Sequence, residues 1–123
     1  MKLRIKGNSI RLRLLRSEVD KFAEAGHISE EICFGTSALK YSLSMSSDAD
    51  AVRAAFADDE IVVFIPEQAA IDWTTNENVG FEIEQRIGRD RALTIIVEKD
   101  FVCVDRPNDP DRDDAFPNPN VIC

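Results

Sequence analysis

The sequence predicts a single α+β domain with an antiparallel or mixed sheet of about seven strands and two or three short helices on one side of it. A length of 123 residues is typical of one domain. Several segments alternate apolar and polar residues, as half-buried strands do, and most of them are joined by short turns. We expect residues 1–104 to form the domain and residues 105–123 to form an acidic tail rich in Pro and Asn.

The N-terminal segment predicts a β-hairpin followed by a helix. Residues 2–6 and 10–14 each alternate charged and aliphatic side chains, with a Gly-containing turn between them. Because side chains alternate across a strand, the aliphatic residues share one face and the cations share the other. A short amphipathic helix is expected over residues 18–25, ended by Gly26.

The middle of the chain predicts two strands, a helix, a central strand and another helix. Residues 28–34 and 39–46 read as strands, and a helix is expected from Ser47 to about Asp58. The continuous apolar run 61–65 is typical of a central strand that is covered on both faces. A helix beginning at Pro66 and the helix before this strand are expected to provide the cover.

The last third of the sequence predicts a second hairpin and an irregular tail. Residues 79–84 and 93–97 are expected to pair across Gly88, and residues 101–104 could add a short strand. The segment after them is too rich in Asp, Asn and Pro for regular structure. No internal repeat is detectable in the sequence.

Composition indicates a soluble cytoplasmic protein. No apolar run approaches the roughly 18 to 20 residues of a membrane span, and the N-terminus lacks the apolar block of a signal peptide. The three cysteines, Cys33, Cys103 and Cys123, are odd in number and far apart, which favours reduced thiols over a disulfide framework.

Charge is distributed unevenly along the chain. The net charge of −8 argues against nucleic acid as a partner, yet residues 1–16 hold six cationic side chains and no acidic one. The polar face of the predicted N-terminal hairpin is the candidate ligand-binding site, because guanidinium groups bind phosphate or carboxylate bidentately. Its residues are Arg4, Lys6, Arg11 and Arg13. The alternative is internal neutralisation by Glu82 and Glu84 across neighbouring strands.

The segment Glu82-Ile83-Glu84-Gln85-Arg86 places two carboxylates and a guanidinium on one face of a strand. Carboxylates can hold Mg²⁺ beside a polyphosphate. The spacing resembles the strand motif of the triphosphate tunnel enzymes, although that family carries it near the N-terminus and within a closed eight-stranded tunnel. An alternative function is therefore a metal-assisted phosphohydrolase-like enzyme using Glu82 and Glu84, whereas a solvated charged face would be the structural explanation.

Nucleophilic catalysis finds little support. His27 is the only histidine and follows the Gly expected to end a helix, and Cys103 lies among apolar residues where a thiol stays protonated. No phosphate loop, nucleophile turn or Cys-x-x-Cys motif is present. We assign no catalytic residue and expect no metal or cofactor.

Both ends of the chain carry a resemblance. The segment Leu3–Leu14 at the start, and Phe101-Val102-Cys103 with the Asp-rich stretch and Phe116-Pro117-Asn118-Pro119 at the end, resemble an uncharacterised bacterial single-domain family. That resemblance implies no activity and no site residue. The sequence therefore predicts a small binding or interaction domain, with a protein partner or a small anion as ligand and no membrane contact.

Overall fold

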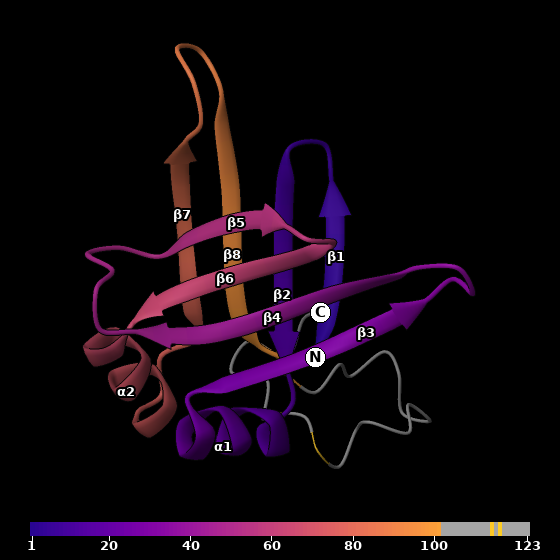
Figure 1. Ribbon diagram of the computed structural model, residues 1–123. Coiled ribbons are helices and arrows are strands. Elements are labelled where there is room, and N and C mark those ends of the chain that lie inside the picture. Colours follow the sequence, from indigo (N-terminus) through magenta and orange to yellow (C-terminus); the bar gives the residue numbers. More distant parts are fainter. Residues whose placement is uncertain (102–113, 115, 117–123) are drawn as a thin grey trace.

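The computed structural model describes residues 1–101, 114 and 116 (Figure 1). These residues form eight strands and two helices in two four-stranded sheets, sheet A with strand order β1-β2-β8-β7 and sheet B with strand order β3-β4-β6-β5. The elements in chain order are β1 (Lys2–Lys6), β2 (Ser9–Leu14), α1 (Arg16–Ala25), β3 (His27–Cys33), β4 (Ala38–Ser46), β5 (Arg53–Ala57), β6 (Glu60–Pro66), α2 (Glu67–Thr75), β7 (Gly80–Arg86) and β8 (Ala92–Lys99).

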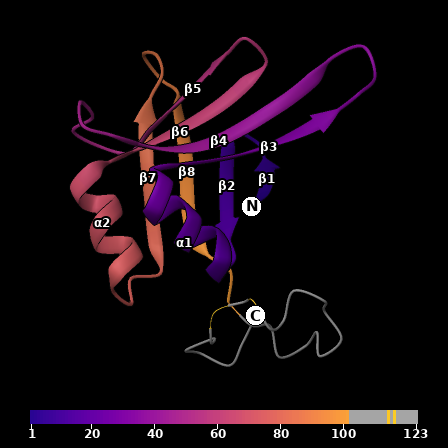
Figure 2. The ribbon, with the colours of Figure 1, turned by 60° about the horizontal axis from the view of Figure 1, so that its bottom comes forward.

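The α+β class with two short helices is confirmed, but the expectation of one sheet of about seven strands is wrong, because the strands form two sheets of four. The strands of sheet B cross in front of those of sheet A (Figure 1), and both helices lie at one end of this sandwich, in the angle between the sheets (Figure 2). Helices of 10 and 9 residues are too short to cover a wide sheet. The apolar faces of the two sheets therefore bury each other.

The helix expected from Ser47 to Asp58 is wrong, because residues 53–57 form strand β5. This strand pairs antiparallel with β6, with Ala54 opposite Val63. Asp58 and Asp59 connect the two strands with φ values of 53° and 61°, the backbone of a tight type I′ hairpin turn. Pairing with the sheet thus overrides the helix propensity of a segment rich in alanine.

Strand β6 is an inner strand, as its apolar run predicts, but helices do not cover both of its faces. Val63 and Ile65 are buried in the core. Phe64 lies half-buried on the opposite face, where the Arg53 guanidinium stacks 4.5 Å from its ring centroid. An aromatic residue under a flat cation keeps this outer face partly shielded without a second layer.

The chain contains a structural repeat that the sequence hides. The order hairpin, helix, hairpin occurs once in residues 2–46 and again in residues 53–99. Exchanging the two halves converts sheet A into sheet B, because each sheet joins one hairpin from each half through a parallel central pair, β2 with β8 and β4 with β6.

Backbone hydrogen bonds follow the same repeat. Thr94 N donates to Asn8 O at 3.1 Å, and the equivalent bond in the other sheet runs from Lys40 N to Asp59 O at 3.0 Å. The register agrees as well, since Ile10 lies opposite Ile95 in sheet A while Ile61 lies opposite Tyr41 in sheet B. The two halves therefore match in backbone geometry and in the positions of buried side chains.

The two largest fully buried side chains lie where the two helices meet. Phe22 of α1 and Trp73 of α2, which occupy equivalent positions in the halves, are fully buried with their ring centroids 6.1 Å apart. Trp73 also contacts Phe81, and its Nε1–H donates to Val79 O at 3.1 Å. An aromatic residue with its polar group satisfied fits a buried position of this kind.

The end of the described chain packs against α1. Phe116 bridges to Phe101 with a ring-centroid distance of 6.0 Å, and the Asp114 carboxylate accepts hydrogen bonds from the Ser17 hydroxyl and backbone N–H. The Ser17 hydroxyl bond holds the pKa of the Asp114 carboxyl below its usual range. Phe101 forms only this isolated bridge, and the rest of the strand expected over 101–104 and of the tail expected over 105–123 lies outside the described residues.

Candidate functional site

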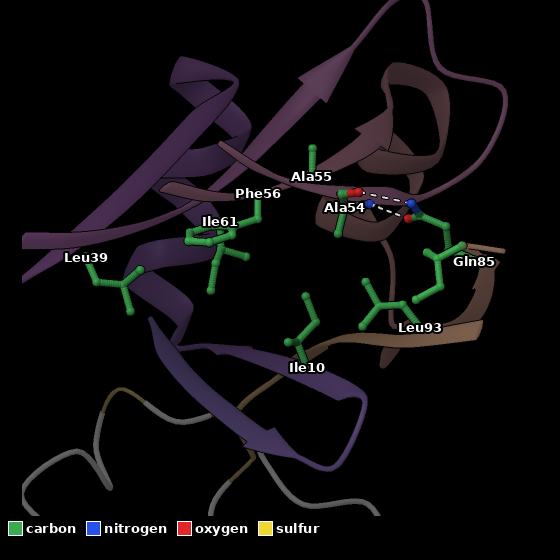
Figure 3. A pocket seen from close by; sticks show the side chains of 9 residues that line it. Ile10, Leu39, Ala54, Ala55, Phe56, Ile61, Gln85 and Leu93 are labelled. Carbon is green, nitrogen blue, oxygen red and sulfur yellow. Dashed lines mark hydrogen bonds between the residues drawn. The ribbon is translucent and has the colours of Figure 1, made fainter. Parts of the chain in front are cut away.

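An apolar cavity of about 490 Å³ lies between the sheets. Side chains from both sheets surround it (Figure 3), and every lining residue except one is apolar: Ile10, Leu39, Ala54, Ala55, Phe56, Ile61, Gln85, Ile87 and Leu93. Its volume falls within the roughly 300 to 1,000 Å³ usual for small-molecule sites.

The cavity exists because the sheets cross instead of lying in parallel. The tips of β1–β2 and β7–β8 extend past β5, at the end of the sandwich opposite the helices (Figure 1). The inward faces of these tips therefore have no strand of sheet B above them. Equivalent residues of the two halves meet here, Ile10 with Ile61 and Leu39 with Leu93.

Gln85 is the one polar side chain in the lining, and its amide oxygen and nitrogen each bond to the backbone of Ala54. Ala54 N–H donates to Oε1 at 2.6 Å, and Nε2 donates to Ala54 O at 3.1 Å (Figure 3). This pair of bonds ties β7 of sheet A to the free edge of β5 in sheet B. Both polar atoms of the Gln85 side chain thus have a backbone partner.

The mouth of the cavity presents apolar side chains to solvent. Phe56 is 68% exposed and Ile87 is 45% exposed although both line the cavity. Ile5, which lies opposite the lining residue Ile10, is exposed as well. Large apolar groups left exposed around a hollow are typical of a binding surface.

The cationic residues predicted as a ligand site share the outer face of sheet A. Arg4 lies directly opposite Arg11, and Lys6 follows on the same face of β1. Arg13 donates from Nε to Glu98 Oε1 at 2.8 Å, and the same oxygen lies 3.6 Å from Arg11. Within the described parts of the chain, no ion pair includes Arg4 or Lys6.

The neutralising carboxylate is Glu98, and not Glu82 or Glu84 as expected for internal neutralisation. Glu98 lies on β8, the strand next to β2, whereas Glu82 and Glu84 lie one strand farther away on β7. Arg11 and Glu82 flank Ile96 across a shallow hollow of about 220 Å³. The cations and these two acids thus share a face but do not meet.

Neither metal binding nor nucleophilic catalysis gains support from the described residues. They contain no cluster of three or more His, Cys, Asp or Glu side chains that could hold a metal ion. His27 bonds to Ser44 through Nδ1 at 2.7 Å, but this pair lies exposed where two strands adjoin. Cys33 is a free, exposed thiol, and Cys103 lies outside the described residues.

Sequence reasoning missed the cavity. The available signal was large apolar residues close to turn-forming residues in the sequence, namely Phe56, Ile87 and Leu39. Residues next to exposed turns are usually polar. Phe56 falls within an expected helix and Leu39 within an expected strand, while Ile87 falls in the connection between two expected strands. Nothing in one segment indicates that another sheet stops short of covering it.

Fold and cavity together define a two-sheet α+β domain with an apolar hollow between its sheets. The chain belongs to the family of unknown function DUF7009, whose model matches residues 1–120. This agrees with the expectation of a family without an assigned activity. No curated protein and no solved structure matches the chain. No helix in the described part of the chain has the length and apolar character needed to cross a membrane.

Proposed function

We propose that this domain binds a small apolar molecule in the cavity between its sheets. The observation that carries the proposal is a hollow of about 490 Å³ lined almost entirely by apolar side chains, among them the exposed Phe56 and Ile87. Burying apolar surface stabilises a complex by roughly 25 cal/mol for each Å² removed from water. A ligand whose apolar surface contacts these walls would gain that free energy.

The lining favours binding over catalysis. Among the lining residues there is no titratable side chain, and the Gln85 amide is already bonded to the Ala54 backbone. A catalytic site needs a group that can transfer a proton, attack a substrate or hold a metal. The walls of this cavity instead offer shape and apolar contact, as a carrier or sensor domain does.

Fluorescence enhancement of the uncharged probe N-phenyl-1-naphthylamine tests the proposal. The parent protein is expected to bind the probe with saturation, and Phe56→Ala is expected to weaken binding by about 5- to 10-fold because an aromatic contact of roughly 1 kcal/mol is lost. Phe56 is largely exposed, so this variant is expected to melt like the parent.

Two further variants make the test specific. Leu93→Trp fills the cavity and is expected to abolish saturable binding. Ile71→Ala on α2, outside the lining, also removes an exposed apolar side chain and is expected to bind the probe like the parent. Equal probe binding by all four proteins would refute the cavity as the site.

A second candidate function is binding of a small anion on the outer face of sheet A. The observation that favours it is the direct opposition of Arg4 and Arg11, with Lys6 beside them and only one long contact from Arg11 to Glu98. Like charges across a strand pair destabilise it, and a bound phosphate or carboxylate would relieve the repulsion. Arg13 completes this proposed site at its edge, next to Glu98.

Phosphate titration in a thermal-shift assay at constant ionic strength tests this candidate. Phosphate is expected to raise the melting temperature of the parent and not that of Arg4→Gln/Arg11→Gln. Arg13→Gln breaks the pair with Glu98 at the edge of the site and is expected to lose about 0.5 to 1 kcal/mol and to reduce the shift. Lys21→Gln on α1 is the control and is expected to keep the full shift. No shift in the parent would count against an anion site.

Mg²⁺-dependent release of phosphate from tripolyphosphate, lost in Glu82→Gln/Glu84→Gln, would instead establish the phosphohydrolase alternative.

A further inference from the structure

We propose that the ligand of the cavity is an amphipathic anion, whose apolar body lies between the sheets and whose charged end contacts the arginines of the β7–β8 turn. This inference rests on the proposed apolar binding function and names its ligand class. A long-chain carboxylate and an aromatic sulfonate share this chemistry.

The β7–β8 turn borders the cavity on both of its sides. Ile87 precedes the turn and Leu93 follows it, and both line the cavity. Hydrogen bonds close the turn, from Ile87 N to Arg91 O at 3.1 Å and from an Arg86 guanidinium nitrogen to Arg89 O at 3.2 Å. These bonds order the backbone of the turn between two residues that line the cavity.

The turn is cationic in a protein whose net charge is −8. It carries Arg86, Arg89 and Arg91, all exposed, against the single acid Asp90. None of the ion pairs within the described ranges includes any of the three arginines. Lys6 adds a further cation at the neighbouring β1–β2 tip, which extends from the sandwich on the same side (Figure 1).

Charges across the mouth would fix the direction of the ligand. The β5–β6 turn, which lies between the lining residues Phe56 and Ile61, holds Asp58 and Asp59. The carboxylate of the following Glu60 is already bonded to the Ser42 hydroxyl. An anionic end is repelled by the two aspartates and attracted by the arginines, because screening is incomplete over a few ångströms. The ligand is thus expected to enter with its charged end toward sheet A.

The experiment compares two probes that share an apolar body and differ in charge. Both 1-anilinonaphthalene-8-sulfonate and N-phenyl-1-naphthylamine carry the anilinonaphthalene group, and only the first bears a sulfonate. The sulfonate is expected to bind the parent about 3- to 10-fold more tightly at low salt, as for one or two exposed charge pairs. Arg89→Gln/Arg91→Gln is expected to remove this preference and leave binding of the neutral probe unchanged.

Controls separate this inference from the apolar function beneath it. Arg16→Gln/Lys21→Gln removes the same charge from α1, at the opposite end of the molecule, and is expected to keep the preference (Figure 1). Equal binding of both probes by the parent, or an unchanged preference in Arg89→Gln/Arg91→Gln, overturns the anion inference while the apolar site stands. Stronger competition by dodecyltrimethylammonium than by dodecyl sulfate overturns it as well. Absence of binding by either probe overturns the apolar function itself.

Discussion

Val63→Asp is expected to abolish the cooperative fold. Val63 lies in inner strand β6 with no exposed surface, at the interface where the two sheets pack. An unpaired carboxylate there loses its hydration without gaining a partner, at a cost of several kcal/mol. Since domains of this kind are stable by only about 5 to 15 kcal/mol, most or all of that stability is lost. Far-UV circular dichroism during urea unfolding measures the effect.

The neighbouring residue gives a matched control. Val62→Asp introduces the same charge one residue earlier, on the half-buried outer face of sheet B. Its carboxylate reaches solvent, and a loss of only about 1 to 2 kcal/mol is expected. A cooperative urea transition for Val63→Asp close to that of the parent would mean that β6 does not form the centre of the core.

Trp73→Ala is expected to lower the free energy of unfolding by about 3 to 5 kcal/mol. The change removes the largest fully buried side chain, its contacts with Phe22 and Phe81, and the hydrogen bond to Val79 O. The resulting cavity lies where both helices meet both sheets, so the surroundings cannot collapse into it without moving an element. Urea denaturation followed by circular dichroism measures the loss. Tryptophan fluorescence cannot follow this variant, because Trp73 is the only tryptophan.

Trp73→Phe separates the contribution of ring packing from that of the hydrogen bond to Val79 O. It retains most of the ring volume and removes the N–H donor, so a loss of about 1 to 2 kcal/mol is expected. Ile71→Ala on the same helix changes a residue that is 41% exposed and is expected to cost less than about 1 kcal/mol. Equal losses for Trp73→Ala and Ile71→Ala would contradict the packing of α2 described above.

Elements that depend on nearby residues were predictable from the sequence. The N-terminal hairpin, α1, β4, β6 and the β7–β8 hairpin are confirmed within a few residues of the expected bounds. Each has a periodicity that its own segment displays, and hairpin pairing requires only a short turn. Strand β5 was mistaken for a helix because its alternation is short and its alanines favour either state.

Pairing between distant segments was not predictable. The parallel pairs β2–β8 and β4–β6 each join two hairpins into a four-stranded sheet. No pattern within a single segment distinguishes these two sheets from one larger sheet. The repeat also escaped detection because many equivalent positions share only apolar character, as Phe22 and Trp73 do, while identical pairs such as Ile10 and Ile61 are isolated.

The candidate sites, too, were predictable only where they depend on nearby residues. Alternation along β1 and β2 correctly grouped the four cations on one face, but the identity of their acidic neighbour followed from strand order, which places Glu98 beside Arg13. The cavity depends on where one sheet stops relative to the other, which is a property of the whole fold. Its residues could be recognised only after the two sheets were in view.

The exchange of hairpins between the two halves of the chain has a consequence for folding kinetics. Neither half can complete a sheet by itself. The pair β2–β8 requires Ser9 to lie opposite Thr94, and the pair β4–β6 requires Lys40 to lie opposite Glu60. Such a high contact order implies slow folding compared with a helical domain of equal length. The N-terminal half of one chain can also pair with the C-terminal half of another chain at high concentration. The segment between Ser46 and Arg53 would then connect the two halves of each chain. Intertwined dimers formed during refolding would then contain the same two sheets as the monomer.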